Sequence, residues 1–259
     1  MPTRPVWRMI TDAKNEPLCN LAREEAIARC SPAQPVLRLW RNSSCVVLGR
    51  FQVSAAEVDE LTCESERMPV YRRFTGGGAV YHDLGNLNVS LVLPRKLGPL
   101  VDDPNLARLP QAYSLVLEPL AHALRMMGLR PIVGTREITI GGHKVSGVAA
   151  WFGVGSVLVH ATLLVNSDLE LLSRVLNGPG APGNSRWERT KSRRASVTSL
   201  AHEGIRDLCA EVVREAVTSA FAGHFGCVLE RADLATKEQE LASELFATRY
   251  SQRRWHVEG

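Results

Sequence analysis

The stretch RRFTGGGAVYHDLGN, residues 72–86, decides how this chain is organised. Its three consecutive glycines leave the backbone free in φ and open to close approach by another molecule. Residues typical of strands stand on both sides of them. A glycine run in that position is either a plain tight turn or a loop whose N–H groups hold an anion. The arginines, threonine, histidine and asparagine of the stretch favour the ligand loop, because a turn needs none of these groups.

The composition is that of an ordinary globular protein. The chain has 259 residues, 45% of them hydrophobic and 22% charged, which is enough to bury a sizeable core. Its net charge of +4 is too small to indicate a nucleic-acid partner by itself. The six cysteines form no Cys-x-x-Cys pair, which favours free thiols in a reducing compartment. Since the N-terminus lacks a signal-peptide core and no apolar run could span a bilayer, we expect a cytoplasmic protein with no membrane partner.

Hydrophobic periodicity predicts strands and helices in alternation, with one long irregular segment. We expect strands at residues 6–10, 36–40, 45–49, 137–140, 143–150 and 156–165, and helices at residues 20–28, 55–61, 113–127, 168–176, 207–222 and 238–246. Gly141 and Gly142 predict a hairpin between two of the strands. Residues 178–196 are rich in glycine and proline and then strongly basic, which is typical of a loop.

Two further motifs follow the glycine stretch. GHKVSG, residues 142–147, taken alone is a hairpin with an exposed lysine, Lys144. HATLL, residues 160–164, places His160 within a strand. A buried histidine in a strand is more often structural than catalytic, and that remains the favoured interpretation of its chemistry.

Together these motifs resemble the lipoate–protein ligases, within the wider superfamily of biotin and lipoate ligases and octanoyltransferases. NLAREE at residues 20–25 and LWRN at residues 39–42 extend the resemblance, which covers roughly residues 6–255. It implies an α+β fold with a mixed, largely antiparallel sheet flanked by helices, as in biotin ligases and class II aminoacyl-tRNA synthetases. It also implies a single catalytic domain over residues 1–259, without a C-terminal accessory domain.

The resemblance implies an enzyme that activates lipoate with ATP and Mg²⁺ to lipoyl-AMP and then acylates a carrier lysine. The implied carriers are lipoyl domains of 2-oxoacid dehydrogenase acyltransferase subunits, the glycine cleavage H protein or similar proteins, and a separate accessory protein is expected. Lys144 takes the catalytic role, in contact with the lipoate carboxyl and the α-phosphate. The residues implied at lipoate or lipoyl-AMP are Trp40, Arg73, Thr75, Gly76, Gly77, Gly78, Ala79, His82, Asn86, Lys144, Ser146, His160 and Thr162.

Three features leave the interpretation open or depart from the family pattern. The family places an Asn-Asp pair at adenine and metal, and here Arg136 and Glu137 stand in its place. Glu137 can still ligate Mg²⁺ through oxygen, but the asparagine that contacts adenine is missing. Ala161 replaces the usual glycine after His160. The basic segment at residues 178–196 is either a solvated linker or, by resemblance, a lid that faces the carrier.

Other functions remain as alternatives. An octanoyl- or lipoyl-transferase of the same fold needs a nucleophilic cysteine, but none lies between Cys63 and Cys209. The Gly-Arg-Gly-Arg-x-x-Arg loop of biotin ligases is missing. A non-catalytic protein that binds lipoyl-AMP or nucleic acid is the alternative from another class, supported by the basic segment and the missing Asn-Asp pair.

Overall fold

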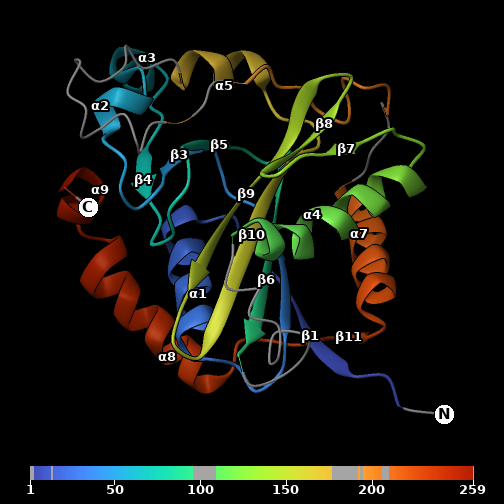
Figure 1. Cartoon of the computed structure of the whole chain (residues 1–259). Coiled ribbons are helices and arrows are strands. Elements are labelled where there is room, and N and C mark those ends of the chain that lie inside the picture. The colour runs from blue at the N-terminus through green and yellow to red at the C-terminus, as the bar shows by residue number, and fades with distance from the viewer. Residues whose placement is uncertain are drawn as a thin grey trace.

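Two β-sheets form the frame of the protein (Figure 1). The structure is a computed structural model that describes residues 3–12, 14–95, 109–176, 192, 195–205 and 210–258. The larger sheet has eight strands in the order β11-β1-β2-β6-β10-β9-β8-β7, and the smaller has three in the order β4-β3-β5. The strands are β1 (Val6–Thr11), β2 (Val36–Trp40), β3 (Cys45–Leu48), β4 (Val70–Arg72), β5 (Val80–His82), β6 (Asn86–Pro94), β7 (Ile132–Val133), β8 (Glu137–Ile140), β9 (His143–Phe152), β10 (Ser156–Leu164) and β11 (Val228–Arg231).

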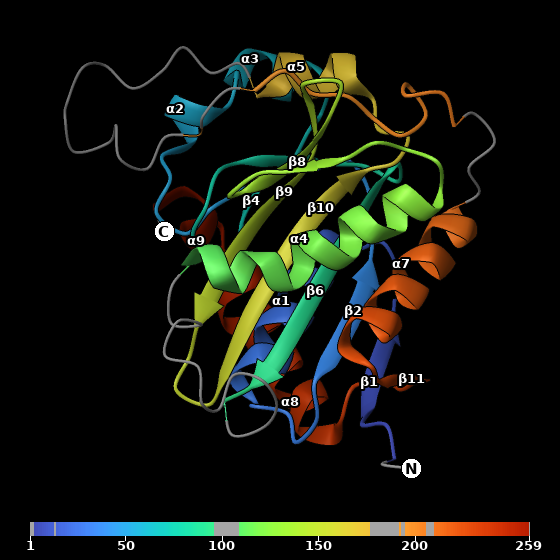
Figure 2. The same ribbon diagram turned by 45° about the vertical axis from the view of Figure 1, so that its right-hand side comes forward.

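Helices cover both faces of the larger sheet. Figure 2 shows α4 lying across one face with α7 beside it, while α1 lies behind the strands. The helices are α1 (Pro17–Arg29), α2 (Ser54–Glu57), α3 (Glu60–Ser65), α4 (Leu109–Met126), α5 (Leu169–Val175), α7 (Ala210–Phe225), α8 (Thr236–Leu245), the π-helix η2 (Phe246–Tyr250) and α9 (Arg253–Glu258). Among the described residues, no helix is both long and apolar enough to cross a bilayer.

Strand direction agrees with the mixed, largely antiparallel sheet expected from the sequence. β1 runs parallel to β2 and β11, whereas β2, β6, β10, β9, β8 and β7 are antiparallel neighbours. The hairpin between β8 and β9 turns at Gly141 and Gly142, whose φ angles are 58° and 86°. Both positive values are those of a two-residue type I′ turn, which twists with the strands it joins.

The central strand β6 separates an apolar layer from a polar one. Its sequence alternates between polar and apolar residues, yet all nine residues are buried. Because side chains alternate across a strand, Leu87, Val89 and Leu91 enter the core beneath α4 and α7. Asn86, Asn88 and Ser90 instead face α1, so a buried polar row lies between that helix and the sheet. This row carries the site.

Some expected elements differ in detail. The helix predicted at residues 55–61 is wrong as one element, because Val58 adopts an extended conformation with φ −112° and ψ 148° and divides it into α2 and α3. The side chain of Val58 is buried in a small apolar cluster, so tertiary packing overrides the helical pattern there. The predicted loop at residues 178–196 lies outside the described residues except for positions 192, 195 and 196.

Arg72 fastens the C-terminal helix to the body of the protein. Its buried guanidinium donates to the carbonyl oxygens of residues 255–257 in α9 and of residues 49, 50 and 52, over distances of 2.6–3.5 Å. Burial and the nearby charge of Arg50 lower the pKa of Arg72. The arginine that opens the glycine stretch is therefore structural.

Candidate active site

The glycine loop, residues 73–79, keeps its shape through close backbone contacts. Gly77 has a φ of +93°, which a side chain would strain. A Cβ on Gly77 would lie 3.0 Å from the Cβ of Ala149 on β9, so the loop rests on that strand. A Cβ on Gly49 would overlap the Gly77 carbonyl oxygen, whereas a Cβ on Gly76 would meet no atom within 4 Å. The loop is therefore packed tightly at Gly77 and open at Gly76.

Arg73 holds the loop from inside. Its Nε donates to Thr75 Oγ1 at 2.9 Å, and one terminal nitrogen donates to the Gly76 and Gly78 carbonyls at 2.7 and 2.8 Å. The other terminal nitrogen donates to the Val47 carbonyl at 3.2 Å. Burial lowers the pKa of Arg73 to about 10, although Glu24 opposes the change. The guanidinium expected to face a ligand is thus engaged with the loop, and its contact with lipoate stays a prediction.

A hydrogen-bonded chain joins the loop to the sheet and to α1. Thr75 Oγ1 lies 3.0 Å from His160 Nε2, and His160 Nδ1 lies 2.9 Å from Glu24 Oε1. The same carboxylate oxygen accepts from Ser90 Oγ at 2.6 Å. Burial alone would raise the pKa of Glu24, but His160 and the hydrogen bond from Ser90 bring it down to about 2. Glu24 is therefore an ionised carboxylate within the core.

Lys144 is aimed by an irregularity in β9. Ile138 pairs with Ser146, but the next residue, Thr139, pairs with Lys144, so Val145 is an extra residue. Such a bulge shifts the alternation of side chains and re-aims them. Val145 is buried in the core beneath α4, while the Lys144 side chain passes over Gly147 on the opposite face, where a Cβ would be 3.0 Å from Nζ.

The strand register completes the arrangement. Gly147 pairs with Thr162, and Ala149 pairs with His160. Lys144, Thr162, His160 and the underside of the glycine loop therefore share one face of β9 and β10. These residues, far apart in the sequence, could contact one small ligand together.

Glu137 lies beside the lysine. Its Oε2 is 3.6 Å from Lys144 Nζ, and the two side chains are 40% and 30% exposed. Within the described part of the chain, no group of three or more His, Cys, Asp or Glu side chains could hold a metal ion. Glu137 thus offers a single carboxylate, which suits Mg²⁺ only when phosphate oxygens complete the coordination.

Ser192 contacts the outer side of the glycine loop. Its Oγ accepts from the Ala79 amide at 2.8 Å and from Gln52 Nε2 at 3.0 Å. Its own amide donates to the Glu57 carboxylate at 3.0 Å. The N–H of the predicted site residue Ala79 therefore donates to a serine hydroxyl. A ligand oxygen at the same position could accept this hydrogen bond equally well.

Two other predicted site residues lie deeper in the polar layer. Trp40 is 3% exposed, and its Nε1 donates to Ser90 Oγ at 2.9 Å. His82 Nδ1 lies 3.0 Å from Asn42 Nδ2, while its Nε2 is buried and has no hydrogen-bond partner. Burial, and then Arg73, lower the pKa of His82 to about 3, so the imidazole is neutral. The indole belongs to the core in this structure, so its contact with a ligand stays a prediction.

Asn86 and Ser146 are placed differently from each other. Asn86 is buried in the polar row, donates to Asn88 Oδ1 at 3.1 Å and leaves its own Oδ1 unpaired. Ser146 pairs with Leu163, whose side chain belongs to the core beneath α4. Ser146 therefore lies on the face away from the glycine loop, and the structure does not bring it together with Lys144.

Sequence reasoning missed the partners that hold the site from behind. Glu24 follows Leu21 by three residues and precedes Ile27 by three, so it lies on the buried stripe of α1. A carboxylate on an apolar helix face was the available signal. Ser90 was visible only as one polar position within the otherwise apolar run of residues 89–93. Nothing in the sequence indicated Gln52, Glu57 or Ser192 as neighbours of the loop.

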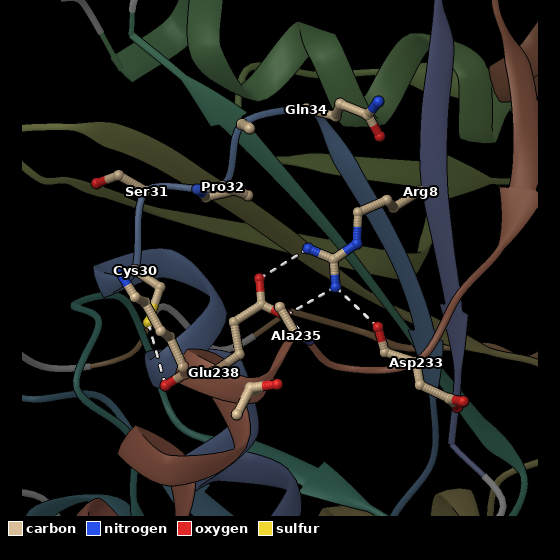
Figure 3. A pocket seen from close by; sticks show the side chains of 11 residues that line it. Arg8, Cys30, Ser31, Pro32, Gln34, Asp233, Ala235 and Glu238 are labelled. Atoms are coloured by element: carbon tan, nitrogen blue, oxygen red, sulfur yellow. Dashed lines mark hydrogen bonds and ion pairs between the residues drawn. The ribbon is translucent and has the colours of Figure 1, made fainter.

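A separate cavity of about 530 Å³ opens between the end of α1 and the start of α8 (Figure 3). Arg8 crosses it and donates to both carboxylate oxygens of Glu238, at 2.8 and 2.7 Å, and to the Asp233 carbonyl at 2.8 Å. None of the predicted site residues lines it. Because these charged groups satisfy one another, the cavity lacks the open polar groups of a reaction centre.

Comparison with known proteins identifies the family. Residues 16–222 match the lipoyl protein ligase A/B catalytic domain. The chain belongs to the lipoyl protein ligase A/B catalytic-domain family. This confirms the family predicted from the glycine stretch. Lipoate-protein ligase A subunit 1 of Thermoplasma acidophilum is 32% identical over 252 residues, covering 92% of this chain and 91% of the relative.

Another family member is longer. Lipoate-protein ligase A of Psychrobacter cryohalolentis is 32% identical over 220 residues, covering 84% of this chain but only 60% of the relative. The chain thus matches nearly all of a protein named as one subunit, and a smaller share of a ligase named without subunits.

Solved structures of family members share the fold. A bipartite lipoate protein ligase from T. acidophilum, described with its E2 lipoyl domain, has a TM-score of 0.82 at 30% identity, covering 99% of this chain and 97% of that chain. A lipoate-protein ligase A with bound ATP has a TM-score of 0.80 at 29% identity, covering 98% and 99%. A T. acidophilum lipoate protein ligase with bound lipoic acid also has a TM-score of 0.80, at 28% identity, covering 99% and 100%. These matches confirm the mixed sheet expected for the family.

Proposed function

We propose that this chain is an ATP-dependent lipoate–protein ligase whose site lies between the glycine loop and the polar face of β9 and β10. The observation that carries the proposal is the placement of Lys144, whose ammonium lies over Gly147 on the face that also bears His160. Relatives named lipoate–protein ligase A, and solved relatives that hold lipoic acid or ATP, support both substrates.

Activation of lipoate brings two anions together. A carboxylate oxygen attacks the α-phosphorus of ATP, and the bond from that phosphorus to the pyrophosphate oxygen breaks. The compact ammonium of Lys144 reduces the repulsion and stabilises the charge on the phosphoryl oxygens. N–H groups of the loop can bind the same oxygens, because successive amides around a glycine turn form an anion-binding concavity.

Transfer uses the same positions. The amine of a carrier lysine attacks the carbonyl carbon of lipoyl-AMP, the bond to the AMP oxygen breaks, and the amine loses a proton. The carbonyl oxygen gains negative charge during the attack, and Lys144 stabilises it there. Thr162, His160 and the glycine loop position the lipoyl group, so that one site serves both half-reactions.

Mg²⁺ fits this site only when it is bound together with ATP. Glu137 supplies one carboxylate next to Lys144, and nucleotide phosphates supply the remaining oxygens. The chain's own contribution would be this neighbouring pair, with the Glu137 carboxylate available to the metal and the Lys144 ammonium available to the phosphate oxygens. The missing asparagine at position 136 leaves adenine to be recognised by other residues.

The proposed partners are a second ligase subunit and a lipoyl carrier domain. The first is supported by the relative named subunit 1, and both are named in the description of the bipartite T. acidophilum system. The carrier domains of 2-oxoacid dehydrogenases and the glycine cleavage H protein present the lysine that this chemistry needs. We place the reaction in the cytoplasm, where free thiols such as those of this chain stay reduced.

A cysteine-based acyl transfer receives less support. Cys45 pairs with His82 in the small sheet, but burial raises the pKa of its thiol well above the usual value. A thiol in that state is a poor nucleophile. The pKa values of Cys30, Cys63 and Cys227 are also raised by burial.

The decisive experiment measures pyrophosphate release from ATP and lipoate. Lys144→Ala should slow it about a hundredfold, the usual loss when a preorganised charge at the transition state is removed. Lys237→Ala, at an exposed lysine on α8, is the matched control and should release pyrophosphate at the wild-type rate. Wild-type release by Lys144→Ala would contradict the assignment of Lys144.

A further inference from the structure

The buried carboxylate of Glu24 is bound on one side only. Oε1 accepts hydrogen bonds from Ser90 Oγ at 2.6 Å and from His160 Nδ1 at 2.9 Å, while Oε2 is buried and has no hydrogen-bond partner. Burying a charge is costly unless it is paired, so this group is expensive to keep in the core. A buried carboxylate of this kind fixes the orientation of the side chains that donate hydrogen bonds to it.

The charge of Glu24 determines the direction of every hydrogen bond that follows. An ionised carboxylate only accepts, so His160 Nδ1 must carry a proton. A ring that carries only this proton presents Nε2 as an acceptor, and the Thr75 hydroxyl then donates across the 3.0 Å between Oγ1 and Nε2. Thr75 Oγ1 remains free to accept from Arg73 Nε at 2.9 Å. The order Glu24, His160, Thr75, Arg73 is consistent at each link.

The reverse order serves the loop less well. If Nε2 carried the proton, it would donate to Thr75 Oγ1, and the hydroxyl hydrogen would have to turn elsewhere. The acceptor available to it is the Gly76 carbonyl at 3.5 Å, a long contact that also competes with Arg73 for that oxygen. The glycine loop is therefore held best when His160 is protonated at Nδ1.

We propose that Glu24 is a positioning residue for the glycine loop, which it orients from α1, on the same face of the sheet, by fixing the tautomer of His160 and, through it, the hydroxyl of Thr75. This rests on the proposed function, because the loop matters as the lipoate site. The influence of Glu24 passes from α1 through β10 to the loop, and Arg73 completes the linkage from within the loop.

The first test needs no substitution. Imidazole ¹⁵N chemical shifts of the full-length protein, measured by long-range ¹H–¹⁵N correlation, report which nitrogen of His160 is protonated. We expect the Nδ1–H tautomer in ligand-free protein. The Nε2–H tautomer would overturn the proposal whatever the enzyme does, so this result is independent of the ligase assignment.

The second test compares lipoate affinity by calorimetry among variants of two adjacent buried glutamates. Glu24→Met removes the acceptor and should weaken lipoate binding about tenfold, which is the size of one lost hydrogen bond. Glu24→Gln keeps a carbonyl oxygen for Nδ1–H and should recover most of the affinity. Glu25→Met is the matched control, since Glu25 bonds Tyr250 and Arg249 instead, and it should lose stability but keep lipoate affinity.

A cycle of variants separates a linkage from general damage. Thr75→Val should lose about as much affinity as Glu24→Met. The double variant Glu24→Met/Thr75→Val should lose little more, because residues of one network are not additive. Wild-type protein that binds lipoate while Glu24→Met binds it equally well would overturn the proposal. Wild-type protein that binds no lipoate would instead contradict the proposed function.

Discussion

The side chain of Lys144 lies directly over Gly147, so that a methyl group at Gly147 would sit 3.0 Å from both Cε and Nζ of the lysine. They are three positions apart in the sequence, and in a regular strand they would lie on opposite faces. The extra residue Val145 in β9 returns them to one face. Gly147 thus provides the space that the end of the Lys144 side chain occupies.

Gly147→Ala should therefore displace Lys144 without unfolding the protein. The colliding atoms are the far end of a flexible side chain, which can move at little cost in stability. A shift of about 1 Å at a reacting group can reduce a rate about a hundredfold. We expect pyrophosphate release to fall by one to two orders of magnitude, with little change in melting temperature. Gly223→Ala on α7, where an added methyl meets nothing within 4 Å, is the control. A fully active Gly147→Ala enzyme would show that the position of Lys144 is not critical.

Two neighbouring glycines of the loop should behave differently. Gly77→Ala forces a side chain into a φ of +93° and against Arg73, and should lower the free energy of unfolding by about 1–2 kcal/mol. Gly76→Ala meets no protein atom within 4 Å and should leave stability unchanged. If lipoyl-AMP occupies the open side of the loop, Gly76→Ala should still weaken its binding. Urea unfolding and ligand titration of both variants separate these effects, and equal effects on stability would contradict the structure.

Part of the candidate site can be predicted from the sequence, and part of it cannot. The glycine run at residues 76–78 predicts a loop with positive φ and close backbone approach, and Gly77 has both. Its interpretation as a ligand loop depends on the polar residues around it and stays a prediction. The direction of Lys144 depends on a bulge, which alternating patterns do not reveal. Arg73 looked like a ligand contact because sequence shows which donors exist, but not which carbonyls satisfy them. Glu24 is held by Ser90, 66 residues away, and by His160, 136 residues away, and such distant pairings emerge only in the folded sheet.

Arg72 should control the order of the C-terminal helix. Arg72→Ala removes the donor shared by the carbonyls of α9 and of residues 49–52, and should lower the free energy of unfolding by roughly 3 kcal/mol. Amide hydrogen exchange in residues 253–258 should rise above that of the rest of the chain. Arg253→Ala, at an exposed position on α9, should change neither quantity. Unchanged exchange in α9 would mean that Trp255 and its neighbours hold the helix without Arg72.

His82 should make stability depend on pH. Its folded pKa, lowered by burial to about 3, lies below the usual histidine value of 6.5, so the unfolded chain takes up a proton that the folded chain does not. The contribution to stability is complete above pH 6.5 and is lost as the pH falls from 6.5 towards 3. One proton corresponds to about 1.4 kcal/mol per pH unit. Between pH 7 and pH 5, His82→Gln should lose about 2 kcal/mol less stability than wild type. His122→Gln, at an exposed position on α4, should follow wild type.

The two half-reactions should respond differently to a second subunit. The chain covers 91% of a relative named subunit 1 and 97% of a chain of a bipartite ligase. We propose that lipoyl-AMP and its carbonyl are held by parts that this chain itself supplies: the glycine loop, Lys144 and the polar face of β10. Activation makes a further demand, because the triphosphate must be held with one carboxylate, Glu137, and without the asparagine of the family. We therefore expect the purified chain to transfer lipoate from supplied lipoyl-AMP to a lipoyl domain, and to activate lipoate with ATP slowly until the second subunit is added.

A bound subunit accelerates activation only if it prefers the conformation that binds ATP productively. Measuring AMP release and carrier acylation with each starting compound, with and without that subunit, distinguishes the cases. If the chain alone acylates a carrier from ATP and free lipoate at about 1 per second or faster, the ordinary range for enzymes, then it needs no partner for activation.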